Sequence, residues 1–267
     1  MNLIRNSKPI KYGLLLFLVV ILVATFFDLK ISMLVYNPNS LFGQILEACG
    51  EFPASMIAMF SSVGLWYTSP NHKKWFVTIG YGVLTILFGF MSAMLPSHYF
   101  NWNIVVTIVL TICYIGLSYY LCTKIKNEYL ILFRKACIIG LLMFVLQILT
   151  VTGLKMLWGR ERYRNMFPNL ELFTPWFLPQ GLTSNNEFMS FPSGHSANAA
   201  MLIWLTLVPS FTSFNKKLWT IIPIIWIVVV PFSRIIMGAH FLSDVTFGVI
   251  ITLVYFILLK NKFMKEV

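Results

Sequence analysis

The stretch ACIIGLLMFVLQILTVTGL, residues 136–154, is nineteen residues long and carries no charged side chain. A helix rises about 1.5 Å per residue, so a stretch of this length can cross the hydrocarbon core of a membrane, which is about 30 Å thick. Comparable stretches recur along the chain, which is 58% hydrophobic and 11% charged, with a mean hydropathy of +0.78. Soluble globular domains carry about 25% charged residues. The sequence therefore predicts an integral membrane protein.

Eight stretches are predicted membrane spans, so the expected fold class is an all-α, polytopic transmembrane helix bundle. The second span is the weakest, because Pro53, Ser61, Ser62 and Gly64 interrupt it. No linker, charge block or repeat divides the chain, so we expect residues 1–267 to form a single domain. The predicted spans are Tyr12–Phe27, Phe52–Tyr67, Phe76–Leu95, Ile104–Cys122, Ala136–Leu154, Ala197–Phe214, Leu218–Phe232 and Val245–Leu259.

Basic residues are distributed unevenly between the two sides of these spans. With a cytoplasmic N-terminus, fourteen of the twenty lie on the cytoplasmic side, and the six outside are Lys30, Lys155, Arg160, Arg162, Arg164 and Arg234. Because Lys and Arg are enriched in cytoplasmic loops, we expect both termini in the cytoplasm. The first span is expected to stay as an anchor, because Leu22 and Ala24 make a poor signal-peptide cleavage site.

The low-charge loops, rich in Lys, Asn and Ile, favour a bacterial plasma membrane. The net charge of +11 would also fit a nucleic-acid partner. However, the basic residues lie in short loops beside apolar stretches, so the membrane explains them and no nucleic-acid partner is expected.

Three polar segments are predicted to emerge on the extracytoplasmic face. KMLWGRERYR, residues 155–164, follows the fifth span, and PSGH, residues 192–195, precedes the sixth. SRIIMGAHFLSD, residues 233–244, follows the seventh. No predicted span separates the first two segments, and two spans separate the second from the third. The three segments are therefore expected on one side of the membrane, where they can form a single site.

The PSGH segment has the residue types of a helix start that binds an anion. Pro192 has a preset φ angle, Ser193 is a favoured N-cap residue, and Gly194 permits close approach of the backbone. Free N–H groups and the helix dipole attract phosphate to such a position. His195 would then be placed to pass a proton to the bound group. The same residues also fit a plain capped helix with an interfacial histidine.

His240 and Asp244 are four residues apart, so a helix would place them on one face. An aspartate in that position can hold one imidazole nitrogen as N–H and leave the other free as a nucleophile. In a straight helix, Arg234 would lie on a different face from His240 and Asp244. A bend at Gly238 could bring Arg234 back to their side. Alone, the pair also fits two polar groups that satisfy each other at a membrane edge.

Lys155 and Arg162 are seven residues apart, which is about two helical turns, and share one side if the stretch is helical. Cations gathered there would neutralise the oxygens of a transferring phosphoryl group. The alternative is ordinary flanking charge at the end of a span.

Together, the set Lys155-x6-Arg162, Pro192-Ser193-Gly194-His195 and Ser233-Arg234-x5-His240-x3-Asp244 resembles the motifs of the type 2 phosphatidic acid phosphatase superfamily. This superfamily includes lipid phosphate phosphatases, bacterial undecaprenyl diphosphate phosphatases, glucose-6-phosphatase and the vanadium haloperoxidases. The resemblance covers about residues 150–260. One position departs from the pattern: Tyr163 follows Arg162, where the first motif of the family usually ends in Arg-Pro.

The resemblance implies a role for each matched residue. His240 would attack phosphorus and form a phosphohistidine, Asp244 would orient its imidazole, and His195 would protonate the leaving oxygen. The residues implied to bind the phosphate oxygens are Lys155, Arg162, Ser193, Gly194 and Arg234. No cofactor and no metal is implied. The acids predicted outside form no clustered carboxylate–histidine set for a two-metal site; they are Asp28, Glu47, Glu51, Glu161, Glu171, Glu187 and Asp244.

The expected function is that of a lipid phosphatase whose partners are its lipid substrate and the membrane lipids. Undecaprenyl diphosphate, phosphatidate and phosphatidylglycerophosphate are candidate substrates, and the first is preferred on family grounds alone. Two alternatives are a phosphotransferase with an acceptor other than water, and a lipid-carrier transporter without turnover. Transporter sites lie near the bilayer midplane, whereas these motifs lie at span ends. The aromatic segment 165–191 fits either an interfacial border of the lipid entry path or a cover over the bundle end.

Overall fold

The computed structural model of the chain describes residues 8–70 and 74–264, and all regular structure in these ranges is helical. Arg5, Lys73, Lys265 and Glu266, which fall in predicted cytoplasmic segments, lie outside the described residues. The α-helices are α2 (Lys8–Val35), α3 (Leu41–Cys49), α4 (Phe52–Tyr67), α5 (Trp75–Tyr99), α6 (Ile104–Thr123), α7 (Leu130–Trp158), α8 (Tyr163–Met166), α9 (Gly194–Ala200), α10 (Leu218–Ile236) and α11 (Leu242–Phe263). The 3₁₀-helices are η1 (Asn127–Tyr129), η2 (Leu170–Leu172), η3 (Asn186–Phe188) and η4 (Met201–Ser210). The predicted all-α class is confirmed.

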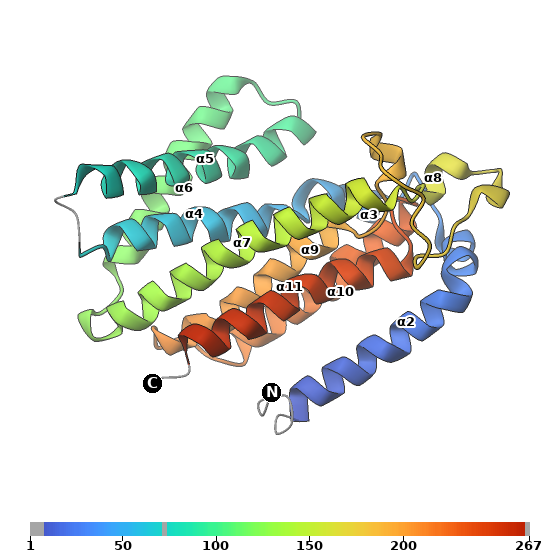
Figure 1. Cartoon of the computed structure of the whole chain (residues 1–267). Helices are drawn as coiled ribbons and strands as arrows, with labels where there is room; N and C mark the ends of the chain where they lie inside the picture. Colours follow the sequence, from blue (N-terminus) through green and yellow to red (C-terminus); the bar gives the residue numbers. More distant parts are fainter. Residues whose placement is uncertain (1–7, 71–73, 265–267) are drawn as a thin grey trace.

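The long helices form one bundle. Figure 1 shows α4, α7, α10 and α11 side by side, with α9 among them and α2 on one flank. The hairpin of α5 and α6 packs on α4 at the other flank. The start of α2 and the end of α11 lie at one end of the bundle, while α3, α8 and the long loops lie at the other.

Among the described residues, six helices are long and apolar enough to cross a membrane: Lys11–Val35, Trp75–Tyr99, Ile104–Thr123, the region Asn127–Met166, Leu218–Ile236 and Leu242–Phe263. The other two predicted spans are helical but shorter. The second is α4, with 16 residues, and the sixth is divided into α9, with 7 residues, and η4, with 10. From the rise per residue, α4 is about 24 Å long and α9 with η4 is about 30 Å. The chain is a multi-pass membrane protein, and the count of eight crossings stays a prediction.

Two differences from the predicted boundaries concern the end of the bundle with the long loops. Helix α2 continues past the predicted limit at Phe27 to Val35, and the additional part carries Asp28, which is buried and paired with Arg160 at 3.1 Å. Helix α3 is not predicted from hydropathy, since it is short. Its N-cap residue Ser40 accepts a hydrogen bond from the backbone N–H of Gly43. Both features bring N-terminal residues to the polar motifs.

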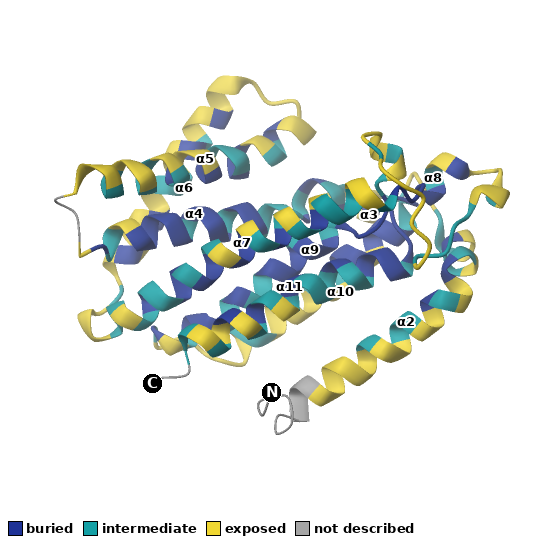
Figure 2. Ribbon diagram, viewed as in Figure 1, coloured by how far each residue is buried: buried dark blue, intermediate teal, exposed yellow. Residues whose placement is uncertain are grey.

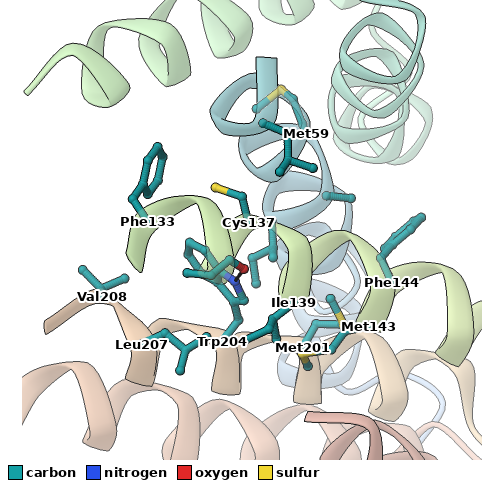
Figure 3. Close-up of a cluster of buried hydrophobic side chains, with 14 of the residues drawn as sticks. Met59, Phe133, Cys137, Ile139, Met143, Phe144, Met201, Trp204, Leu207 and Val208 are labelled. Carbon is teal, nitrogen blue, oxygen red and sulfur yellow. Dashed lines mark hydrogen bonds between the residues drawn. The ribbon is translucent and has the colours of Figure 1, made fainter. Parts of the chain in front are cut away.

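The core lies where α4, α7 and η4 meet, and Figure 3 shows Met59, Phe133, Cys137 and Trp204 among its buried side chains. A side chain at Gly64 on α4 would collide with the Cys137 sulfur, and one at Gly140 on α7 would collide with Ser61. The small residues that weaken the second predicted span therefore permit close contact between α4 and α7. The Trp204 indole N–H donates to the Ala136 carbonyl at 2.7 Å, which fixes η4 against α7.

The outer surface of the bundle is apolar, as expected for a protein in lipid. Figure 2 shows that α2 and α6 are largely exposed and that α4 and α9 are largely buried, whereas α5 and α7 each have buried and exposed residues. The exposed residues of the outer helices include large apolar side chains such as Leu16, Phe26, Ile86 and Ile112. If so large an apolar surface faced water, it would promote association between protein molecules. The lipid of the membrane is therefore the expected surrounding of these helices.

Candidate active site

The three polar segments meet at one end of the bundle, formed by the C-terminus of α7, the N-terminus of α9 and the turn between α10 and α11. Backbone hydrogen bonds link them: the Ser193 N–H donates to the Asp244 carbonyl, and the Arg164 N–H donates to the Gly238 carbonyl, both at 2.9 Å. The structure therefore brings together the segments that the sequence predicts to share one face. The extracytoplasmic location of this face stays a prediction.

Lys155 and Arg162 do not share a helix, and the prediction of a common helical side is wrong. Helix α7 ends at Trp158, and Gly159 follows with a left-handed φ of 61°. A side chain at Gly159 would also lie 2.5 Å from the carbonyl oxygen of Gly181, so glycine is required both for the turn and for the passing loop. The chain changes direction at Gly159, and Arg162 reaches the site from the loop that follows α7.

His240 and Asp244 also do not share a helix, because α11 begins only at Leu242. The preceding turn is made by Gly238, with a left-handed φ of 62°, as the sequence predicts for a bend at this position. The His240 N–H donates to the Arg234 carbonyl at 3.3 Å, so the turn places the histidine beside the end of α10. The predicted bend at Gly238, which brings Arg234 back towards the site, is confirmed. The prediction that His240 and Asp244 lie on one face of the same helix is wrong.

The imidazole of His240 is 2% exposed, and its Nδ1 lies 2.7 Å from the carbonyl oxygen of Ser190. A carbonyl oxygen only accepts hydrogen bonds, so Nδ1 must carry the proton in this contact. The nitrogen Nε2 then keeps its lone pair. Nδ1 is 3.9 Å from the Asp244 carboxylate, which is too long for a hydrogen bond. A main-chain oxygen, rather than the predicted aspartate, therefore selects the tautomer.

Asp244 organises the groups around His240. Its carboxylate accepts hydrogen bonds from the Ser190 hydroxyl at 2.6 Å and from the Phe241 N–H at 2.8 Å. It also pairs with the fully buried Arg160 at 2.5 Å, and Arg160 in turn contacts Asp28 of α2. Ser190 contacts the His240 ring through its carbonyl oxygen, and Phe241 is the residue next to His240 in the chain. Asp244 therefore acts on the imidazole indirectly, by holding these two residues in position.

The N-terminus of α9 has the predicted cap. The Ser193 side chain accepts from the Ser196 N–H at 3.3 Å, and Gly194 is the first helical residue. An ideal Cβ at Gly194 would lie 3.6 Å from Lys155 Cε, so the glycine faces the cation cluster. His195, on the first turn, is partly exposed, and its Nδ1 lies 3.0 Å from Glu51 Oε1.

The cations of the site have unused hydrogen-bond donors. Arg234 is 1% exposed and contacts Glu47 through Nη2 at 3.1 Å, while its buried Nε and Nη1 have no partner among the described residues. Arg162 donates through Nη2 to the Asn186 side chain at 2.9 Å, and its buried Nε has no partner there either. Lys155 Nζ donates to the Met189 carbonyl at 2.6 Å. Buried unpaired donors are costly, so this arrangement favours an anionic ligand.

The field of these cations acts on His240. Burial lowers the pKa of the imidazole, and the positive charges of Lys155, Arg162 and Arg234 lower it further, to well below its ordinary value. The imidazole is therefore neutral at physiological pH. A neutral ring with a free Nε2 beside an anion site has the properties of a nucleophile for phosphorus.

Two acids at the site, Glu47 and Glu51, are not among the predicted site residues. They come from α3 and from the junction of α3 and α4, far from the motifs in sequence. The only signal in the sequence is that both belong to the few acids on the predicted outer side. Burial acts to raise the pKa of Glu51, but the positive charge of His195 and its hydrogen bond prevail and lower it to about 2.

The segment 165–191 packs over the end of the bundle. Trp176 and Phe191 contact Phe247 of α11 with ring centroids 4.8 and 5.1 Å away, and Trp158 stacks near Phe191 at 4.7 Å. These contacts fit the cover predicted as one of two alternatives. Tyr163, at the departure from the family pattern, is buried as the first residue of α8, a position that proline also favours.

Among the described residues, no group of three or more His, Cys, Asp or Glu side chains is arranged to hold a metal ion. A cavity of about 650 Å³ lies between α4, α6 and η4, and none of the candidate site residues lines it. It begins at Phe52 and Pro53, which directly follow Glu51, and its lining is mostly apolar and aromatic. The cavity runs towards Lys124 and Phe214 at the opposite end of the bundle.

Comparison with known proteins agrees with the geometry. A family model described as the PAP2 superfamily matches residues 135–267. Over 121 residues the chain is 38% identical to phosphatidylglycerophosphatase B of Bacillus subtilis (strain 168), a match that covers 42% of this chain and 58% of that relative. No solved structure matches the chain. Through residues 135–267 the chain belongs to the PAP2 superfamily, as the motifs predict.

Proposed function

We propose that the protein is a membrane lipid phosphatase that hydrolyses a lipid phosphate or isoprenoid diphosphate through a phosphohistidine on His240. The observation that carries this proposal is the set of buried, unpaired guanidinium N–H groups of Arg162 and Arg234 beside a neutral imidazole. Family membership and the name of the relative support a phosphatase. The reaction is proposed to need no metal and no cofactor, because fixed cations supply the charge that a metal would supply elsewhere.

In the first step, Nε2 of His240 attacks phosphorus in line with the bond to the leaving oxygen. The P–N bond forms while the P–O bond breaks, and His195 donates its proton to the leaving oxygen. Lys155, Arg162 and Arg234 hold the phosphoryl oxygens. The Gly194 N–H at the start of α9 and the Ser193 hydroxyl are proposed to complete the anion site.

In the second step, water attacks the phosphohistidine. His195, now neutral, accepts a proton from that water, so the P–N bond breaks and inorganic phosphate leaves. His240 regains its lone pair and His195 its proton, and the cycle is closed. Asp244 is proposed to keep the imidazole in position throughout, through its hydrogen bonds to Ser190 and Phe241.

A lipid substrate is supported by the cavity that begins at Phe52 and Pro53. A phosphate held at His240 and His195 would have this apolar space available for its hydrocarbon chain. Pockets of about 300–1,000 Å³ lined mainly by apolar groups are typical of ligand sites. The name of the relative supports phosphatidylglycerophosphate, and the cavity equally suits the chain of phosphatidate or undecaprenyl diphosphate.

The whole chain is proposed to act as one domain in the plasma membrane of a bacterium, with the site on the extracytoplasmic face and both termini in the cytoplasm. Contacts from Asp28, Glu47 and Glu51 to the motifs support the single domain, because all three lie outside the matched region. The excess of basic residues on the opposite side supports the orientation.

The test is phosphate release by the purified protein in liposomes, with a panel of phosphatidate, phosphatidylglycerophosphate and undecaprenyl diphosphate and with EDTA present. We expect release from at least one of these lipids at nearly the rate measured without EDTA, and no release by His240→Ala. Complete loss of activity in EDTA that magnesium restores would contradict the proposed mechanism. Lack of release from every lipid would contradict the function itself.

A further inference from the structure

Glu51 reaches the active site from a part of the chain that the family match does not cover. It is the residue immediately before α4, and its Oε1 lies 3.0 Å from Nδ1 of His195. Residues 135–267 carry the family match, so this contact joins the N-terminal part of the chain to the proposed proton donor. An ideal Cβ at Gly194 would lie 3.8 Å from the same oxygen, which places the carboxylate beside the start of α9.

Two polar side chains lie behind this carboxylate. Gln147 of α7, which is buried, donates through Nε2 to the Asn198 Oδ1 at 2.7 Å. Because its oxygen is engaged, the Asn198 amide has its NH₂ group left to offer, and Asn198 helps to lower the pKa of the Glu51 carboxyl. Asn198 lies one turn beyond His195 on α9, so Glu51 bridges two residues of the same helical face.

The backbone before Glu51 has little freedom. A side chain at Gly50 would collide with the Leu46 carbonyl and would lie 2.8 Å from Val230 Cγ1 of α10. Pro53 follows in the first turn of α4, where its fixed φ suits a helix start. The carboxylate of Glu51 therefore has a fixed position at the junction of α3 and α4, and it does not lie on a flexible loop.

The proposed proton donor lies among groups of both charge signs. His195 is on the first turn of α9, where the helix dipole disfavours a cation. The charged groups around it are the cations Lys155 and Arg234 and the acids Glu47 and Glu51, and the neutral imidazole of His240 is also nearby. Glu51 is the acid in direct contact. Its low pKa, about 2, keeps it a carboxylate throughout the physiological range.

We infer that Glu51 is a positioning residue for catalysis, which holds the Nδ1–H of His195 and stabilises its imidazolium so that Nε2 can protonate the leaving oxygen. This inference rests on the proposed function. The carboxylate accepts the Nδ1 proton in a hydrogen bond and does not take part in bond making or breaking at phosphorus. Loss of its charge should therefore affect the step in which the leaving group needs a proton, and little else.

The test compares two substrates with the variant Glu51→Gln, which keeps the size of the side chain and removes its charge. The first substrate is a lipid phosphate, whose alkoxide leaving group needs a proton. The second is an aryl phosphate with an acidic phenol, which leaves without one. We expect kcat/KM to fall by about 10²-fold or more for the lipid phosphate, the typical contribution of general acid catalysis, and by far less for the aryl phosphate. Glu51→Asp, which keeps the charge, should recover part of the lost activity.

Glu47→Gln is the matched control, since Glu47 is the neighbouring carboxylate and contacts Arg234 rather than His195. Any change in this variant should be of similar size for both substrates. An equal loss on both substrates in Glu51→Gln, or no loss on the lipid phosphate, would overturn the inference. Inactivity of the unmodified protein on both substrates would instead contradict the proposed function, so the two failures are distinguishable.

Discussion

At His240, burial and neighbouring charge act on the same imidazole in the same direction. The ring is almost fully buried, and Lys155, Arg162 and Arg234 surround it with positive charge. Both effects disfavour the imidazolium and lower the pKa. The Ser190 carbonyl then fixes the proton on Nδ1. The folded protein therefore holds a neutral imidazole with a free Nε2, as the proposed nucleophilic role requires.

The first prediction concerns the titration of this histidine. Because the folded-state pKa lies below the ordinary value of about 6.5, the neutral ring should persist as the pH falls below 6.5. Below pH 6.5 the unfolded chain then binds a proton at this histidine more readily than the folded protein does. The free energy of unfolding should therefore decrease as the pH falls from about 6.5. NMR of imidazole-labelled protein, with the resonance assigned by its loss in His240→Gln, should give an inflection well below pH 6.5. An inflection at or above 6.5 would disprove the described environment.

The sequence predicts the residue types of the site better than their partners. The spacing of His240 and Asp244 suggests a direct pair, but α11 begins at Leu242, so Asp244 contacts Arg160, Ser190 and the backbone instead. Periodicity cannot reveal where a helix starts when no sequence cap marks the position. Glu51 could not be predicted either, because its contact with His195 depends on how α4 packs against α9.

Among the elements, α4 connects the candidate active site to the apolar cavity. Glu51 precedes its first turn, while Phe52, Pro53 and Met56 line the cavity from the same turns. The opposite wall is formed by α6, with Tyr114 packed edge-on against Phe52 at a centroid distance of 5.8 Å. A chain bound in this space would therefore leave its phosphate near His195.

The second prediction tests this use of the cavity with two residues of α6. Leu117 and Ile112 are both exposed apolar residues, but only Leu117 lines the cavity. Leu117→Trp should displace part of a long hydrocarbon chain and raise KM about tenfold for a long-chain substrate, equivalent to the lost burial of about two methylene groups at ~0.8 kcal/mol each. KM for a short-chain substrate with the same phosphate should not change.

Ile112→Trp serves as the control and should affect neither substrate, since Ile112 does not line the cavity. Kinetic measurement in the same detergent or lipid for all three proteins provides the comparison. An unchanged KM ratio between long and short chains in Leu117→Trp would show that the cavity does not hold the substrate chain.

At the scale of the whole molecule, the site is built from both halves of the chain. The matched region contributes the histidines and the cations, while α2, α3 and the start of α4 contribute Asp28, Glu47 and Glu51. The ends of α2 and α11 lie together at the end of the bundle opposite the site (Figure 1). An even number of crossings is consistent with this arrangement.

The third prediction concerns the orientation in the membrane. The basic loops and the C-terminal end of α11 should face the cytoplasm, and the site the exterior. A tag at Lys216 or Lys262 should be inaccessible in intact cells and become accessible after permeabilisation, whereas a cysteine label at the exposed Asn185 should react from outside. The reverse pattern of labelling would place the proposed substrate in the cytoplasmic leaflet and contradict the predicted topology.

Hydropathy is sufficient to predict a helical membrane bundle, because apolar stretches of span length admit few other structures. It does not predict which helices are neighbours. Gly64 and Ser61 lower the hydropathy of α4, yet they let it pack closely on α7 and become central to the fold. The 3₁₀ geometry of η4 is likewise a result of packing, with Trp204 fixed to the Ala136 carbonyl.

The transfer of phosphate to His240 is tested most directly by rapid, acid-free quenching of the enzyme with a radiolabelled lipid phosphate. We expect an acid-labile phosphoryl group on His240, found by peptide mapping. His240→Ala should lose this group and at least about a thousandfold in turnover, as is typical when a covalent nucleophile is removed. His195→Ala should still form the phosphoenzyme with an aryl phosphate that has an acidic phenol. A phosphoryl group on His195, or an active His240→Ala enzyme, would contradict the account.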